Sequence, residues 1–221
     1  MKEKIDVFTK YCKEKFALDS VVEYNYHSLS VCLIDCIYSL RAKYFVVTIP
    51  IVDRYSQAFM RGDKYAEGDT LKDLLSHIDE CGGIDHFVDR ILKNHQKLGR
   101  NIPKEQVLVN FANTLIKMGI NTMRDFQKYK DQEKLEMEIR SIPGLGDAAV
   151  NYIFMLAGDP GRCKPDVHIH RCLMDALGED MSNDKCQALF QGTVENLQVE
   201  YPGLTVRQLD GIIWQEYQSK R

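Results

Sequence analysis

The feature that most constrains this chain is a short turn rich in proline and glycine between two segments of helical character. The turn reads Ile142-Pro143-Gly144-Leu145-Gly146-Asp147, and an apolar run over 148–157 follows it directly. Proline and glycine this close together predict a tight turn between two helices. Glycine permits positive φ values and the close approach of another molecule. The second helix would begin with free N–H groups and a positive dipole end, which favour an anion such as a backbone phosphate of a nucleic acid.

A second motif follows downstream, Lys164-Pro165-Asp166-Val167-His168-Ile169-His170-Arg171. Asp166 precedes a predicted helix that runs to Leu177. Aspartate is a preferred N-cap, and a helix start favours its ionised form. A cap alone would explain this residue, a chemical role is the alternative, and the two do not exclude each other. His168 and His170 do not share a helix face and lack an evident third ligand, so we predict no metal site.

Together the two motifs resemble those of the helix-hairpin-helix DNA glycosylases, the superfamily of endonuclease III, the adenine glycosylase and the alkyl-base glycosylases. The turn has the form apolar-Pro-Gly-apolar-Gly, and 166–171 is similar to the family's Asp-x-His-apolar-x-Arg. The resemblance implies an all-α fold of two helical subdomains with a cleft between them. Residues 28–157 would form the subdomain that ends in the hairpin. Residues 1–27 and 158–221 would form the second, which carries Asp166.

Two departures from the family narrow the chemistry that the resemblance implies. Ala148 stands where bifunctional members carry a lysine nucleophile, and only Cys172 and Cys186 follow Arg171, where endonuclease III has a four-cysteine iron–sulfur loop. The implied activity is therefore that of a monofunctional DNA N-glycosylase in base excision repair, without lyase activity. Asp166 would be the carboxylate that stabilises an oxocarbenium-like sugar and orients or deprotonates water.

The resemblance also implies which residues contact double-stranded DNA. Arg41, after an apolar helix over 28–40, would enter the gap left by an extruded base, with a solvated surface arginine as the alternative. The other implied contacts are Gly144, Leu145, Gly146, Ala148 and Arg171. The candidates for stacking on the extruded base are four aromatic residues, with packing in the core as the favoured alternative for each: Tyr38, Tyr44, Phe45 and Tyr152. We expect a monomer without a cofactor, unless a monovalent cation binds the hairpin carbonyls.

The acidic charge of the chain is the main evidence against DNA binding. The chain has a net charge of −3, whereas duplex-binding proteins usually present a basic face. Asp147 directly follows Gly146, where a phosphate should bind, and its carboxylate would repel an anion. These two observations motivate a non-catalytic DNA-binding module on the same fold as a second hypothesis. A helical protein with another ligand in the cleft is a third.

Further patterns bear on location and on basic surfaces. The first fifteen residues are mostly charged and no apolar run is long enough to span a bilayer, so we expect a soluble, cytoplasmic protein. The seven scattered cysteines favour reduced thiols. Residues 84–98 are predicted to form one amphipathic helix. Its polar face would carry the best basic stripe in the chain: Arg90, Lys93, Lys97 and Arg100.

Overall fold

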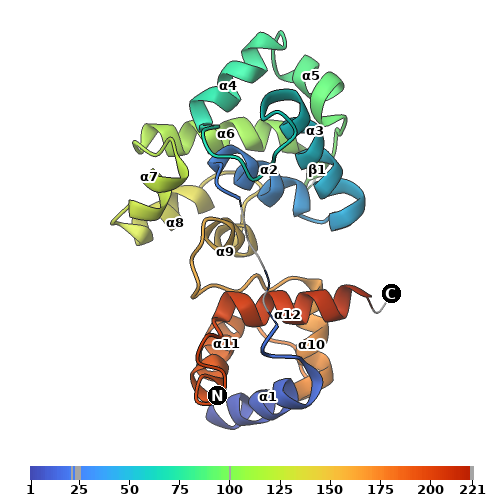
Figure 1. Ribbon diagram of the computed structural model, residues 1–221, viewed down its shortest axis with the longest axis vertical. Helices are drawn as coiled ribbons and strands as arrows, with labels where there is room; N and C mark the ends of the chain where they lie inside the picture. The colour runs from blue at the N-terminus through green and yellow to red at the C-terminus, as the bar shows by residue number, and fades with distance from the viewer. Residues whose placement is uncertain (21, 23–25, 100, 220–221) are drawn as a thin grey trace. The chain divides into compact units, whose positions relative to one another are not determined.

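The computed structural model describes residues 1–20, 22, 26–99 and 101–219, and their regular secondary structure is almost entirely helical (Figure 1). The predicted all-α class is confirmed. The first elements are α1 (Lys2–Lys15), α2 (Leu29–Ser39), the π-helix η1 (Tyr44–Thr48), α3 (Ile49–Phe59), α4 (Leu71–Glu80), α5 (Ile84–Phe87) and the π-helix η2 (Val88–Leu92). They are followed by β1 (Lys97–Leu98), β2 (Ile102–Pro103), α6 (Lys104–Lys117), α7 (Met123–Lys128), α8 (Gln132–Arg140), α9 (Asp147–Leu156), α10 (Val167–Leu177), α11 (Asn183–Leu197) and α12 (Val206–Ser219).

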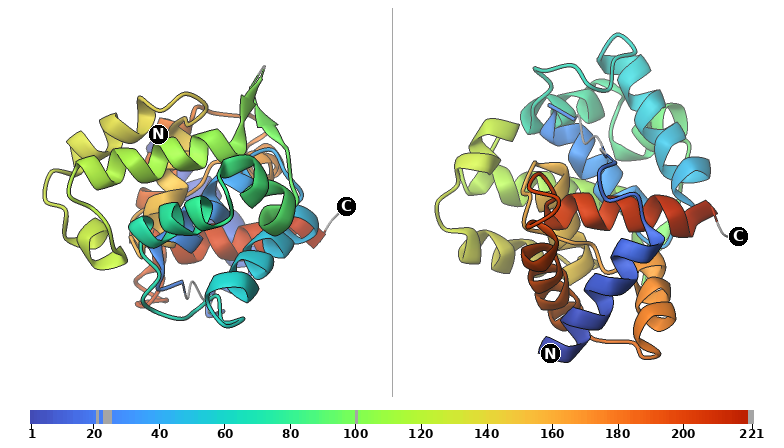
Figure 2. Two further views of the ribbon diagram at one scale, coloured as in Figure 1. Left: turned by 90° about the horizontal axis from the view of Figure 1, so that it is seen from above. Right: turned by 60° about the horizontal axis from the view of Figure 1, so that its bottom comes forward.

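The chain divides into two compact units, one made of residues 1–24 and 158–221 and the other of residues 25–157. In the unit of residues 25–157, α2 is the central helix. Every residue of α2 is buried, and the helix packs against α3, α6 and α9. In the other unit α1 packs against α10 and α11, and α10 packs against α12 (Figure 2). The core of that unit joins residues from both ends of the chain, such as Phe8 and Phe190.

Local capping residues explain where several helices begin. Thr70 and Thr122 each form a capping box with the aspartate three residues later, at the starts of α4 and α7. The Ser28 hydroxyl accepts the Val31 N–H at the start of α2. Gly178 ends α10 in the left-handed conformation, with φ of 71°. These boundaries follow from side chains that are adjacent in sequence.

The prediction of a single helix over residues 84–98 is wrong. The helical segment widens from α5 into the π-helix η2 and ends at Leu92. Lys93, which follows, has a φ of 51°, and its N–H donates to the Val88 carbonyl oxygen. The Arg54 guanidinium then binds the terminal carbonyl oxygens of this segment, including that of Ile91 at 3.2 Å. The chain continues into the short antiparallel pair β1–β2. The predicted basic stripe is thus distributed over different elements, and its member Arg100 lies outside the described residues.

A buried lysine fixes the end of the central helix. Lys104 is 1% exposed, and its Nζ donates to the carbonyl oxygens of Tyr38 (3.1 Å) and Leu40 (2.8 Å) and to Gln96 Oε1 (3.0 Å). Helix termini leave carbonyl groups without intrahelical partners, and a cation there is favourable. Immediately after this anchored end, Arg41 takes a left-handed conformation with a φ of 54°. Lys104 therefore determines where the chain turns from α2 toward η1.

A membrane-crossing helix is absent from the described part of the chain, because none there is both long and apolar enough.

Candidate functional site

The predicted hairpin is formed by α8, a turn over 141–146, and α9. Gly144 in this turn has a φ of 99°, which side chains other than glycine rarely adopt. A Cβ at this position would also lie 3.3 Å from Leu98 Cδ1 and 3.4 Å from Val107 Cγ2. Glycine is required here for two reasons: the backbone has a positive φ, and the turn packs closely on β1 and α6.

The start of α9 presents a cluster of unsatisfied backbone donors. Gly146 occupies the N-cap position and supplies no side-chain acceptor. Within the described residues, the N–H groups of Gly146, Asp147 and Ala148 donate to no protein acceptor. A Cβ built on Gly146 would meet nothing within 4 Å, so the approach to these amides is open on that side. The arrangement can bind an anion, because three donors and the positive helix end coincide.

Asp147, which argued against anion binding, has an ion-pair partner across the hairpin. Its Oδ1 accepts from Arg140 Nε at 2.8 Å, and Arg140 also contacts Glu136 at 3.0 Å. The hydrogen bond to Asp147 raises the pKa of the Arg140 guanidinium above its usual value. Both side chains of the Asp147 pair are partly exposed, so the pair adds little stability, but it offsets the carboxylate's charge where a phosphate would arrive. Arg140 was not predicted from sequence as a site residue, although it lies in the last turn of the first hairpin helix, α8.

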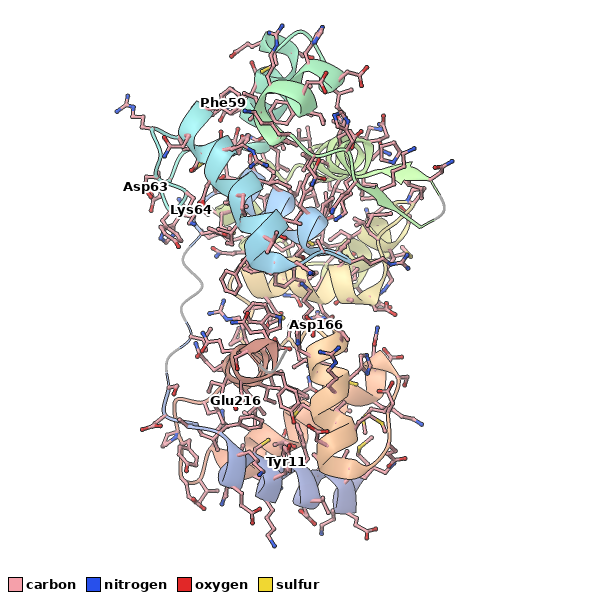
Figure 3. The ribbon with its side chains drawn as sticks, turned by 90° about the vertical axis from the view of Figure 1, so that its right-hand side faces the viewer. Tyr11, Phe59, Asp63, Lys64, Asp166 and Glu216 are labelled. Carbon is pink, nitrogen blue, oxygen red and sulfur yellow. The ribbon has the colours of Figure 1, made fainter. Side chains whose placement is uncertain are left out.

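Asp166 is the N-cap of α10, at the amino-terminal end of that helix (Figure 3). A single carboxylate oxygen does the capping: Oδ1 accepts the His168 N–H at 2.8 Å and the Ile169 N–H at 3.3 Å. In the described part of the chain, Oδ2 accepts no hydrogen bond. The side chain is partly exposed. This geometry separates two roles within one carboxylate, because capping holds Oδ1 in place and leaves Oδ2 for another molecule.

The other residues of the downstream motif differ in their surroundings. His168 is 7% exposed, and its ring meets the Trp214 ring edge-on at 5.9 Å. His168 Nδ1 has no hydrogen-bond partner among the described residues. His170 Nδ1 lies 2.5 Å from Asp180 Oδ1, whereas Arg171 is exposed. No group of three or more potential metal-binding side chains occurs in the residues that the structure describes.

A second carboxylate, which the sequence did not indicate, lies close to Asp166. Asp210 on α12 is 4% exposed and accepts the Lys164 N–H at 2.8 Å, two residues before Asp166. Burial, and next the negative charge of Asp166, raise the pKa of Asp210 well above its usual value. In sequence Asp210 is a lone acid in an otherwise apolar stripe of the last helix, so no local pattern distinguishes it.

The unit of residues 25–157 contains a buried aspartate surrounded by three tyrosine hydroxyls, which was not predicted from sequence. Asp35 on α2 is fully buried and accepts hydrogen bonds from the hydroxyls of Tyr26 (3.0 Å), Tyr44 (2.7 Å) and Tyr152 (2.8 Å). Burial, followed by the charge of Asp35, raises the pKa of Tyr152 and of Tyr44 well above the usual value. Tyr44 and Tyr152, which were considered for stacking on an extruded base, are therefore held by hydrogen bonds from their hydroxyls to Asp35.

The remaining predicted residues lie as follows. Tyr38 is fully buried beneath the Lys104 ammonium group, whereas Phe45 is 57% exposed. Arg41 is exposed at the end of α2. The unit of residues 25–157 thus carries Arg41 and the hairpin residues, and the other unit carries Asp166 and Arg171.

A family model described as "Domain of unknown function (DUF8548)" matches residues 6–219. No curated protein sequence matches the chain.

Among solved structures, similar folds occur in DNA glycosylases. The 8-oxoguanine glycosylase/lyase of Clostridium acetobutylicum, in complex with double-stranded DNA containing cytosine opposite 8-oxoG, has a TM-score of 0.57 and 11% sequence identity, covering 97% of this chain and 66% of that one. MBOgg1, in complex with a low-affinity DNA ligand, has a TM-score of 0.56 and 12% identity, covering 87% of this chain and 60% of that one. The chain spans less than two thirds of the length of either protein. At this identity the likeness establishes a shared fold.

Proposed function

This chain belongs to the DUF8548 family, and we propose that it is a monofunctional DNA N-glycosylase of base excision repair, which hydrolyses the N-glycosidic bond of a damaged or mispaired base. The observation that carries the proposal is the N-cap geometry of Asp166, downstream of a helix-hairpin-helix turn with free amides. The fold shared with two glycosylases that were solved with DNA supports it. We place the protein's action on double-stranded DNA as a monomer.

The proposed chemistry needs one ionised carboxylate beside the sugar. The bond between C1′ and the base nitrogen breaks, the base leaves with the electron pair, and positive charge develops on the sugar. Asp166 Oδ2 stabilises that charge and accepts a proton from the water that attacks C1′. The His168 and Ile169 amides hold the other carboxylate oxygen, Oδ1, in place. The proton then passes from Asp166 to the departing base, so the products are a neutral free base and an abasic sugar, and the carboxylate is regenerated.

The hairpin would hold one DNA strand during this reaction. Phosphate contacts from backbone amides fix a protein's position on DNA without reading sequence. The amides of Gly146, Asp147 and Ala148 provide such contacts, and Arg140 offsets the nearby acidic charge. We assign further DNA contacts to Gly144, Leu145, Arg171 and Arg41, the last as the side chain that enters the space of the extruded base.

Replacing Gly146 with alanine should weaken duplex binding by about tenfold without affecting folding, a loss of roughly one charge-assisted hydrogen bond. Gly146 has a φ of −122°, which alanine tolerates, and the added Cβ meets no protein atom within 4 Å. It would instead obstruct the phosphate. Gly203→Ala is the matched control, because its Cβ also meets nothing within 4 Å and Gly203 belongs to the unit that does not contain the hairpin. Fluorescence anisotropy across a salt series measures the effect, and equal affinities for the two variants would contradict the assignment.

The wild-type protein should form no borohydride-trapped adduct with any duplex it processes. Ala148 occupies the position where a lysine amine would form the imine that borohydride reduces. Gel electrophoresis after single-turnover reactions with lesion and mismatch duplexes reports both outcomes: alkali-sensitive abasic sites reveal excision, and a retarded band reveals the adduct. Excision without an adduct is the expected result. An adduct would refute the monofunctional mechanism, and the absence of excision on every bound duplex would favour the non-catalytic binding module.

A further inference from the structure

Asp210 ties α12 to the segment that carries Asp166. Its Oδ1 accepts the Lys164 N–H at 2.8 Å, and the Asp166 N–H donates to the Lys164 carbonyl oxygen at 2.7 Å. The preceding loop is attached to the same helix, since the Arg207 N–H donates to the Pro160 carbonyl oxygen at 3.0 Å. The position of Asp166 therefore depends on α12 as well as on its own helix.

Asp210 lies in surroundings that disfavour its negative charge. The side chain is nearly inaccessible to water, and its helix neighbours Leu209 and Ile213 belong to the apolar core of the unit. Transferring a carboxylate out of water without a cationic hydrogen-bond partner is costly, and such groups usually bind a proton instead. Within the described residues, Asp210 receives a single hydrogen bond, and the donor is a neutral backbone amide.

The ionisable groups near Asp210 act in opposite directions. Asp166, at the start of α10, disfavours a negative charge on Asp210, and the effect of Asp166 is second only to burial. Lys164, in the loop, favours that charge more weakly. The Cys163 thiol, next to Lys164, is itself influenced by Asp210, although burial is the main cause of its raised pKa. Burial and the charge of Asp166 raise the pKa of Asp210, and their combined effect is larger than the lowering caused by Lys164.

We propose that Asp210 is protonated at neutral pH, so that this buried acid anchors the Lys164 amide without placing a second negative charge near Asp166. Asp210 is thus a positioning residue. The expected effect of Asp210 on the rate of base excision rests on the proposed function. The protonation of Asp210 does not depend on that function.

Carbon-13 NMR of the aspartate carboxyl groups tests the location of the proton directly. In the full chain, with Asp210→Asn used to assign the signal, the Asp210 carboxyl carbon should have the chemical shift of a protonated acid at pH 7. In Asp166→Asn its titration midpoint should move to lower pH, because a neighbouring negative charge has been removed. An ionised Asp210 at pH 7, or an unchanged midpoint in Asp166→Asn, would overturn the proposal.

The pH dependence of unfolding provides a second readout that does not involve DNA. A carboxyl group whose pKa is raised by folding stabilises the fold below its unfolded pKa of about 4, and that contribution is lost as the pH rises through the folded value. Asparagine cannot titrate but retains an acceptor for the Lys164 amide. The stability of Asp210→Asn relative to wild type should therefore increase from pH 4 to pH 8, while that of the exposed control Asp184→Asn should not. A pH-independent difference for Asp210→Asn would contradict the proposal.

Excision assays then separate this proposal from the proposed function. Asp210→Asn should keep most of the excision rate at pH 7, because it mimics the protonated acid. Asp210→Ala, which also removes the acceptor for Lys164, should lose about tenfold or more, as expected when a supporting residue is removed. If Asp210 is protonated but the protein excises no base, the proposed glycosylase function is refuted and the proposal for Asp210 stands. Loss of the rate in Asp210→Asn comparable to that in Asp210→Ala would show that Asp210 acts as an ionised group, against the proposal.

Discussion

Asp166→Asn should reduce base excision by on the order of 100- to 1,000-fold, the effect of removing one electrostatic stabiliser of a transition state. The side-chain oxygen of asparagine can still accept the His168 and Ile169 N–H groups, and asparagine is as good an N-cap as aspartate. The helix start should therefore remain intact while the negative charge is lost. Single-turnover rates on the preferred duplex, with thermal unfolding of both proteins, measure the two effects.

Two further variants separate capping from charge. Asp166→Ala removes the cap as well, and should lose about 1 kcal/mol of stability in addition to the rate. Asp184→Asn removes an exposed acidic group from the same unit and should leave the rate unchanged. If Asp166→Asn excises bases at the wild-type rate, Asp166 is a structural cap and the carboxylate mechanism is wrong.

Lys104→Met should destabilise the protein by about 3 kcal/mol, because hydrogen bonds to a charged group are each worth roughly 1.5–3 kcal/mol and their buried partners are left unsatisfied. Methionine fills similar space but offers nothing to the carbonyl oxygens of Tyr38 and Leu40. The end of α2 would lose its anchor, and with it the left-handed turn at Arg41. Urea unfolding followed by circular dichroism gives the change in stability.

Lys117→Met is the control for this substitution. Lys117 is an exposed lysine in the last turn of the same helix, α6, and exposed substitutions usually change stability by less than about 0.5 kcal/mol. Similar stabilities for the two methionine variants would show that the buried hydrogen bonds of Lys104 contribute little. Desolvation of the ammonium group would then offset them.

What the sequence predicted correctly depends on residues that are close together in the chain. The hairpin turn follows from Pro143, Gly144 and Gly146, and the start of α10 follows from its cap, Asp166. The same local reasoning failed for residues 84–98, where helical periodicity continues past the point at which Arg54, from another helix, binds the terminal carbonyl groups.

Four of the residues described above were not predicted from sequence, and three of them contact groups that lie far away in the chain. Lys104 binds carbonyl groups more than sixty positions earlier, and Asp210 binds an amide 46 positions earlier. Asp35 receives the hydroxyl of Tyr152, 117 positions later. Arg140 is the exception, because its partner Asp147 is only seven positions away, and the turn geometry itself would have suggested the ion pair. Tertiary packing decides the other three.

Mass spectrometry of both products after a single turnover tests the proposed base excision most directly. Wild-type protein is mixed with a panel of lesion and mismatch duplexes, and the free base and the abasic strand are analysed together. The expected result is a released base from at least one duplex, together with an abasic strand that is not cleaved. Binding of these duplexes without release of any base would contradict it.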